Sequence, residues 1–279
     1  MVSERMASAT ITAMKLQTLG FRFTLLTPCF SGGADGKAGA SEIRVPPIRG
    51  HVRGWHRELF GVKESNLVWG SASDPASAGS RVALRLLETA PASVRNAPVL
   101  PHKFPAGRPA LMPMANFTIE MQRLVGCSND NWRHAERSMR TWLLAGCLGY
   151  RSNRAAGSVW PADGSAPTNG AKLVEELRSL GLKWPVRVSD PPGELDAIEL
   201  RKTASDTISN RQFFGAAGDE RVPSPVRFKV VSFAGGFALL ATAPPREVSA
   251  EGKKQHLVDA ALNALKHKQA WSGLQWKAF

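Results

Sequence analysis

Residues 42–57 read EIRVPPIRGHVRGWHR, and this stretch decides what the first half of the chain can form. Two prolines predict a helix start, because the fixed φ of proline suits the first turn and that turn does not need the missing donor. Gly61 predicts the end of this helix near Phe60. The residues that form its apolar stripe, at i, i+4, i+7 and i+11, are Ile48, Val52, Trp55 and Leu59.

Two further stripes follow the same predicted helix. Arg49, Arg53 and Arg57 form a basic stripe at i, i+4 and i+8, and Gly50 and Gly54 form a stripe without side chains. Each glycine inside a helix costs about 1 kcal/mol relative to alanine, so two of them indicate close approach of another backbone, from a strand or a ligand. The helix start also suits a phosphate. An amphipathic core helix with a solvated basic face is the alternative interpretation.

The composition points to a polyanionic partner. The chain of 279 residues holds 36 Lys and Arg against 23 Asp and Glu, which gives a net charge of +13. Nucleic acid is the partner class that such a charge favours. A soluble protein that is basic for no functional reason is the alternative interpretation.

Other classes of protein are disfavoured. The three cysteines contain no CxxC pair, so we expect neither a metal site nor a disulfide framework, and no cofactor is indicated. The sequence shows no secretory signal and no apolar run long enough to span a membrane. We therefore expect a cytoplasmic protein without a membrane partner.

The pattern along the first half mixes strands and helices. A strand ending near Thr27 precedes a glycine-rich loop, and a proline-rich segment over 91–113 predicts a projecting loop or a ragged hairpin. A basic loop with glycine follows the second helix. The remaining predicted elements are a strand over 80–88, a strand over 116–124, a helix over 130–148 and the basic loop over 150–160.

The segment 161–170 is rich in Pro, Gly, Ala and Ser and predicts a domain boundary. We therefore expect an N-terminal domain over 10–165 and a C-terminal α+β domain over 166–279. The elements predicted in the second half are a helix over 171–180, a possible strand over 194–202, a hairpin of strands 226–233 and 237–242, and a helix over 252–268.

The order of these motifs resembles the RAMP superfamily of CRISPR type III effector complexes, most closely the first-named RAMP subunit of the Cmr (type III-B) complex. The match covers roughly residues 18–160, and it departs from the family where Ala155 and Ala156 replace the usual glycine after the second arginine of the loop. The motifs that carry the resemblance are Thr27-Pro28, Gly32-Gly33-Ala34-Asp35, Glu42-Ile43-Arg44, Pro47-Ile48-Arg49-Gly50, Arg53-Gly54-Trp55, Leu148-Gly149, Arg151, Arg154 and Gly157-Ser158-Val159.

This resemblance implies an α+β, ferredoxin-like (RRM-like) fold: an antiparallel sheet with helices on one face, and a second, degenerate ferredoxin-like domain. It implies an RNA-binding subunit that contacts guide RNA or the guide–target duplex, with target RNA and other CRISPR effector subunits as partners. We expect the glycine-rich loop, the helix start and the arginine loop to meet at one edge of the sheet. The expected RNA-binding residues are Gly32, Gly33, Arg44, Arg49, Gly50, Arg53, Trp55, Arg57, Arg151, Arg154 and Gly157.

Two other functional classes stay open. A RAMP endoribonuclease that cuts target or precursor guide RNA needs an acid, a base or a metal, and the candidates for catalysis are Asp35, His51 and His56. Asp35 resembles, by its position, the aspartate with which related subunits cut target RNA, although Asp before Gly is also typical of a turn. A helix histidine is often structural. A protein–protein scaffold with incidental charge is the third class.

Overall fold

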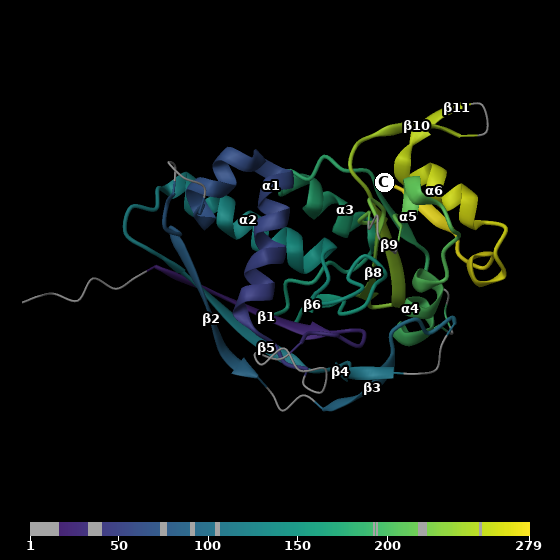
Figure 1. The fold of residues 1–279 in the computed structure, drawn as a ribbon, viewed down its shortest axis with the longest axis horizontal. Coiled ribbons are helices and arrows are strands. Elements are labelled where there is room, and N and C mark those ends of the chain that lie inside the picture. Colours follow the sequence, from purple (N-terminus) through teal and green to yellow (C-terminus); the bar gives the residue numbers. More distant parts are fainter. Residues whose placement is uncertain are drawn as a thin grey trace, which may run out of the picture.

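The computed structural model arranges the chain as two four-stranded antiparallel sheets with helices packed on them (Figure 1). The predicted α+β class with antiparallel sheets is therefore confirmed. None of the helices in the described part has the length and apolar character that a membrane crossing requires. The described residues are 17–32, 41–72, 77–89, 93–103, 107–191, 193, 195–216, 222–250 and 253–279.

The first sheet has the strand order β2-β5-β1-β6, and every neighbouring pair is antiparallel. Along the chain, α1 follows β1 and α2 follows β5, and both helices lie on the same side of the sheet (Figure 1). The proline-rich segment forms the hairpin β3–β4. The bounds are β1 Thr18–Leu25, α1 Val45–Trp69, β2 Val82–Thr89, β3 Val94–Pro98, β4 Gly107–Leu111, β5 Asn116–Arg123, α2 Asn129–Ala145 and β6 Val159–Pro161.

Side-chain alternation along β1 explains this layering. Phe21, Phe23 and Leu25 are buried, and the residues between them are exposed or half-buried, as expected when one face of a strand meets a core. Phe23 stacks on Phe117 of β5 with 5.4 Å between ring centroids, and it meets Trp142 of α2 edge-on at 5.6 Å. The helices therefore cover the face of the sheet that carries these rings.

The predicted basic helix is the first segment of α1. Gly61, with a φ of 88°, ends this first segment as predicted, and a second helical segment that was not predicted follows it to Trp69. Arg49 donates to the carbonyl oxygen of Trp69, and Arg53 donates to Asn66 Oδ1 at 2.9 Å. These bonds hold the second segment back against the first.

The second sheet repeats the strand order of the first. Read from one edge it runs β8-β9-β7-β12. Its strands in chain order, β7, β8, β9 and β12, therefore occupy the places that β1, β2, β5 and β6 have in the first sheet. A helix again follows the first and the third strand, α4 after β7 and α6 after β9. The bounds are α3 Gly170–Ser179, β7 Val186–Ser189, α4 Ala197–Ser205, α5 Arg211–Phe214, β8 Arg227–Phe233, β9 Gly236–Thr242, β10 Glu247–Ala250, β11 Lys253–His256, α6 Leu257–Leu265, η1 Gln269–Trp271 and β12 Trp276–Ala278.

Two predictions in this half are corrected. The strand predicted over 194–202 is wrong: the chain forms α4 there, because Asp196 caps the helix by accepting from the backbone N–H groups of Ile198 and Glu199 at 2.8 Å each. The last helix is shorter than predicted, because the residues before Leu257 pair as β11 with β10. The predicted hairpin of β8 and β9 is confirmed.

Two buried arginines join the halves of the chain. Arg154, from the first half, donates to the Phe214 carbonyl and to Ser224 Oγ, each at 2.9 Å. Arg201, from the second half, donates to the Pro98 carbonyl of β3 at 2.8 Å. Both guanidinium groups therefore satisfy backbone or hydroxyl oxygens across the boundary between the sheets.

A buried lysine and a half-buried arginine on β8 make further contacts of this kind. Lys229 donates to the carbonyl of Leu143 in the last turn of α2, where the helix dipole favours a positive group. The Arg227 guanidinium lies 5.0 Å from the ring of Trp55 and 4.7 Å from that of Trp184. One apolar core runs through both halves, and the division into domains at 165/166 stays a prediction.

Candidate nucleic-acid interface

The two described ends of the glycine-rich loop, the residues just before α1 and the arginine loop meet between the end of β1 and the start of β6, the edge strand of the first sheet. The backbone N–H groups of Tyr150 and Gly157 donate to the carbonyls of Phe30 and Pro28, each at 2.9 Å. The backbone of Glu42, just before α1, donates to the same segment at 3.1 Å. We call this region the loop edge and define it as residues 26–32, 41–44 and 148–158.

The glycine-rich loop leaves and returns at the loop edge. Its base is closed by Ser41, whose hydroxyl donates to the Ser31 carbonyl at 3.0 Å. Gly32 is exposed, and no described atom lies within 4 Å of the position that a Cβ would take. Gly33 and Asp35 lie outside the described residues.

The arginines near the start of α1 differ in what they contact. Arg57 is exposed, whereas Arg49 and Arg53 make the bonds that hold the two segments of α1 together. Arg44 is half-buried, and its Nε lies 3.3 Å from a carboxylate oxygen of Glu42. Of these side chains, Arg57 is the one free to meet a ligand without breaking a contact between described residues.

The stripe of Gly50 and Gly54 is open. Both residues are exposed, and no described protein atom lies within 4 Å of either Cβ position. Pro46 is exposed one turn earlier on the same stripe. Within the described part of the chain no strand or other segment approaches these glycines.

Trp55 is not available for RNA. Its side chain is only 3% exposed and its ring packs on Trp184, with 5.4 Å between centroids. It belongs to the apolar stripe of α1, so its assignment to RNA binding is corrected to a role in the core.

Arg154 is likewise corrected. It is 8% exposed, and its guanidinium stacks over the rings of Phe214 and Phe228 at 5.1 and 6.0 Å. Burial, with the neighbouring Arg151 as a smaller cause, lowers the pKa of Arg154 to about 10. Arg154 therefore holds the fold, and Arg151, which is half-buried with no ion pair to a described residue, is the arginine of this loop that can meet a phosphate.

Gly157 and Ala155 shape the backbone of the loop. Gly157 has a φ of 62°, and a Cβ there would overlap the carbonyl of Leu148, so only glycine fits. Ala155 adopts a φ of 58°, and its carbonyl accepts from Thr27 Oγ1 at 2.6 Å. Ala155 therefore adopts the left-handed conformation at the position where the resembling family has glycine. Gly157 is buried, and its role is to let the backbone pack closely against the Leu148 carbonyl.

The two histidines of α1 are both neutral at pH 7. Burial, and to a smaller extent Arg227, lowers the pKa of His51 to about 4. Burial and the nearby His134 lower the pKa of His56 to about 4, and His56 is fully buried. Among the residues that the structure describes, no three His, Cys, Asp or Glu side chains lie close enough to hold a metal ion.

The hairpin β3–β4 adds cations to the loop edge. Its register pairs Arg95 with Ala110 and Ala97 with Arg108, so these four side chains share one face of the hairpin. The two alanines are buried against Phe30 of the loop edge. The two arginines are exposed, so they flank the same segment.

Further cations gather around His102 near the tip of this hairpin. Its Nδ1 lies 2.8 Å from Ser205 Oγ. Burial lowers the pKa of His102, Asp206 opposes this, and Lys103, Lys268 and Arg151 add to the lowering. Lys103 and Arg151 therefore both lie in the neighbourhood of His102, although 47 positions separate them in the chain.

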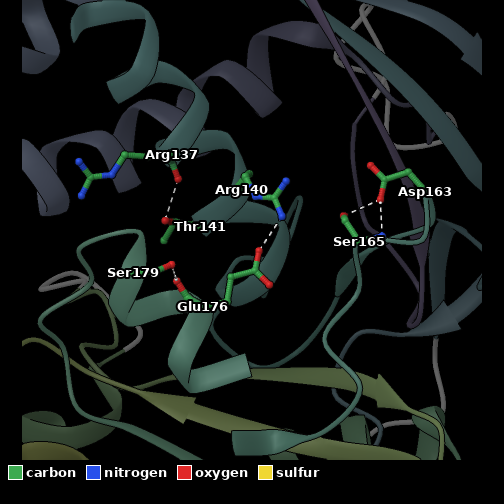
Figure 2. Close-up of polar contacts among 7 residues, drawn as sticks. All are labelled: Arg137, Arg140, Thr141, Asp163, Ser165, Glu176 and Ser179. Carbon is green, nitrogen blue, oxygen red and sulfur yellow. Dashed lines mark hydrogen bonds and ion pairs between the residues drawn. The ribbon is translucent and has the colours of Figure 1, made fainter. Parts of the chain in front are cut away.

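A hollow of about 400 Å³ lies elsewhere, between residues 164–168 and α3. The charged groups near it are paired: Arg140 of α2 meets Glu176 of α3 at 2.7 Å, and Lys172 meets Glu175 at 2.7 Å. Figure 2 shows the Arg140–Glu176 pair, and beside it the side chain of Asp163 turned toward Ser165. Because these charges already have partners, the hollow does not compete with the loop edge as an anion site.

Comparison with solved structures gives the fold. The structure of Cmr1 from Pyrococcus furiosus, in its apo form, is similar with a TM-score of 0.61 and 17% identity, over 95% of this chain and 98% of that one. The chain has the fold of Cmr1. A chain of the type III-B Cmr-beta complex bound to cognate target RNA and AMPPnP is similar with a TM-score of 0.51 and 11% identity, over 82% of this chain and 94% of that one.

Comparisons by sequence give no match, either to a protein-family profile or to a curated protein. The predicted resemblance to a Cmr RAMP subunit is thus confirmed by the three-dimensional arrangement. The two folds are similar although only 17% of the aligned residues are identical, which is too few for the comparisons by sequence to give a match.

Proposed function

We propose that this protein is an RNA-binding subunit of a CRISPR type III RAMP effector complex, in which it contacts guide RNA or the guide–target duplex. The fold similarity to Cmr1 supports this, as does the similarity to a chain of a complex that holds target RNA. Each sheet is, in this proposal, a ferredoxin-like unit. The identical strand order of the two sheets supports that assignment.

The open stripe of Gly50 and Gly54 is the observation that carries the proposal. Two helix glycines cost about 2 kcal/mol together relative to alanine, and no described protein atom uses the space they leave. Arg57 extends the exposed face, and the helix begins at the loop edge. An RNA backbone running from the loop edge along this stripe would account for both the glycines and the cations.

The assembly partners follow from the same reasoning. The guide RNA, the target RNA and the other CRISPR effector subunits are the proposed partners, and the cytoplasm is the proposed compartment. The endoribonuclease alternative gains no specific support: Asp35 lies outside the described residues, and in the described part no three His, Cys, Asp or Glu side chains lie close enough to hold a metal ion. RNA binding is therefore the function that the geometry supports best.

The test is a salt series. Binding of labelled, unrelated RNA sequences to the full chain is followed by fluorescence anisotropy. Replacing Arg57 and Arg151 with alanine removes two phosphate contacts, so the slope of log affinity against log salt falls by about 1.4 for single strands. All the RNA sequences lose affinity alike, because phosphate contacts carry no sequence information.

The matched control replaces two exposed lysines, Lys253 and Lys254 on β11, which lies at the opposite side of the molecule from β3–β4 (Figure 1). This variant keeps the wild-type slope. Equal losses from both pairs of substitutions would mean that only net charge matters, and the proposed interface would be abandoned.

A further inference from the structure

Tyr150 stands out at the loop edge. It is the single tyrosine of the chain and is 42% exposed, whereas most of the described Trp and Phe side chains are buried or half-buried. The other described aromatic residue that is exposed is Phe279, the last in the sequence. A fixed, exposed aromatic ring on a surface rich in cations calls for a ligand with a flat face.

The backbone fixes the place of this ring. The Tyr150 N–H donates to the Phe30 carbonyl at 2.9 Å. The preceding Gly149 has a φ of 85°, and a Cβ there would lie 2.6 Å from the same carbonyl oxygen. The chain therefore approaches Phe30 as closely as glycine permits, and Tyr150 projects from a rigid support. The backbone at Tyr150 is therefore already ordered before a flat partner stacks on the ring, which lowers the entropy cost of binding.

Arg151 is held in an unusual conformation beside the ring. Its φ is 61°, which for a residue other than glycine costs about 1 kcal/mol. Its guanidinium carbon lies 5.4 Å from the centroid of the Tyr150 ring. The strained turn thus sets a cation against the aromatic ring.

The neighbouring charges favour RNA over a protein partner. Lys103 is exposed, and neither it nor Arg151 forms an ion pair with a residue in the described ranges. Arg95 and Arg108 flank the adjoining segment on the hairpin. A protein hot spot would need apolar surroundings that exclude water, whereas an aromatic ring among unpaired cations matches a base with its phosphates.

We propose that Tyr150 is a stacking platform for one unpaired base of single-stranded RNA, with Arg151 and Lys103 neutralising the adjacent phosphates. This inference rests on the proposed function and makes it more specific. A base inside an A-form duplex has both faces covered by its neighbours, so the platform serves unpaired nucleotides alone.

The experiment compares one RNA strand, free and annealed to its complement, by anisotropy with the full chain. Tyr150→Ala lowers affinity for the free strand about tenfold and leaves duplex affinity unchanged, because one stacked base is lost. Tyr150→Phe keeps both affinities, since the ring remains. Neither variant changes the salt slope, whereas Arg151→Ala lowers it by about 0.7.

The outcomes separate the two proposals. If the wild type binds neither form of RNA, the proposed function fails. If the wild type binds RNA but Tyr150→Ala matches it on both forms, or loses equally on both, the stacking platform is wrong while the proposed function stands. Circular dichroism at the binding temperature shows whether each variant is folded, and an unfolded Tyr150→Ala leaves the decision to Tyr150→Leu, which keeps bulk without a flat face.

Discussion

The basic side chains of the interior and those at the surface contribute to the same net charge, but they have different roles. Arg154, Arg201 and Lys229 are buried, and each donates to oxygen atoms on the other half of the chain. Arg57 is exposed beside the open stripe of Gly50 and Gly54, and Lys103 is exposed next to His102. Part of the positive charge that suggests a nucleic acid therefore holds the two sheets together, and only the cations at the surface remain for a ligand.

The largest expected effect comes from breaking an interior contact. Arg154→Ala leaves the Phe214 carbonyl without its donor and opens a cavity beside two phenylalanine rings, so the free energy of unfolding falls by about 3 kcal/mol. Urea unfolding followed by tryptophan fluorescence measures it. The matched variant Arg151→Ala removes a half-buried arginine that forms no ion pair with a described residue, so it changes the same quantity by only about 0.5 kcal/mol. Equal losses from the two arginines would erase the distinction.

The stability contributed by the buried Lys229 is expected to depend on pH. Burial lowers its pKa to about 7, with Cys147 as a smaller opposing influence, whereas an unfolded lysine has a pKa of about 10.4. Between these values the unfolded chain binds a proton that the folded chain has lost, so stability rises with pH. The wild type gains roughly 2 kcal/mol relative to Lys229→Met between pH 7 and pH 9. If the difference in the free energy of unfolding between the wild type and Lys229→Met stays the same from pH 7 to pH 9, Lys229 is charged inside the fold.

The smallest effect lies on the open stripe. Gly50→Ala and Gly54→Ala each raise the free energy of unfolding by about 1 kcal/mol, because both Cβ positions are empty and alanine favours the helix. The same variants weaken RNA binding if a backbone passes over the stripe. Gly157→Ala is the contrasting control, since its Cβ would overlap the Leu148 carbonyl and the variant loses stability. Gains in stability without any loss of RNA affinity would argue against the stripe as a binding surface.

Much of the first half was predictable because its signals are local. The alternation in β1 depends on the period of a strand, and the start of α2 depends on Ser128, whose hydroxyl accepts from the backbone of Asn131 at 3.1 Å. Residues near each other in the chain carry such information by themselves. At Gly61 the local signal predicts the break in the helix, but it does not predict the second segment that folds back after it, because that segment depends on packing.

The sequence by itself determined the alternation of strands and helices, the basic stripe of α1, the glycines that need a reason, and the family resemblance. The tertiary structure alone decided which arginine of the loop points inward, that Trp55 of the apolar stripe packs on Trp184, and that Lys103 and Arg151 both lie near His102. The physical reason is that burial and long-range pairing depend on how two sheets distant in the chain pack together. A residue's chemistry shows what it can bind, but only its neighbours in space show whether it is free to do so.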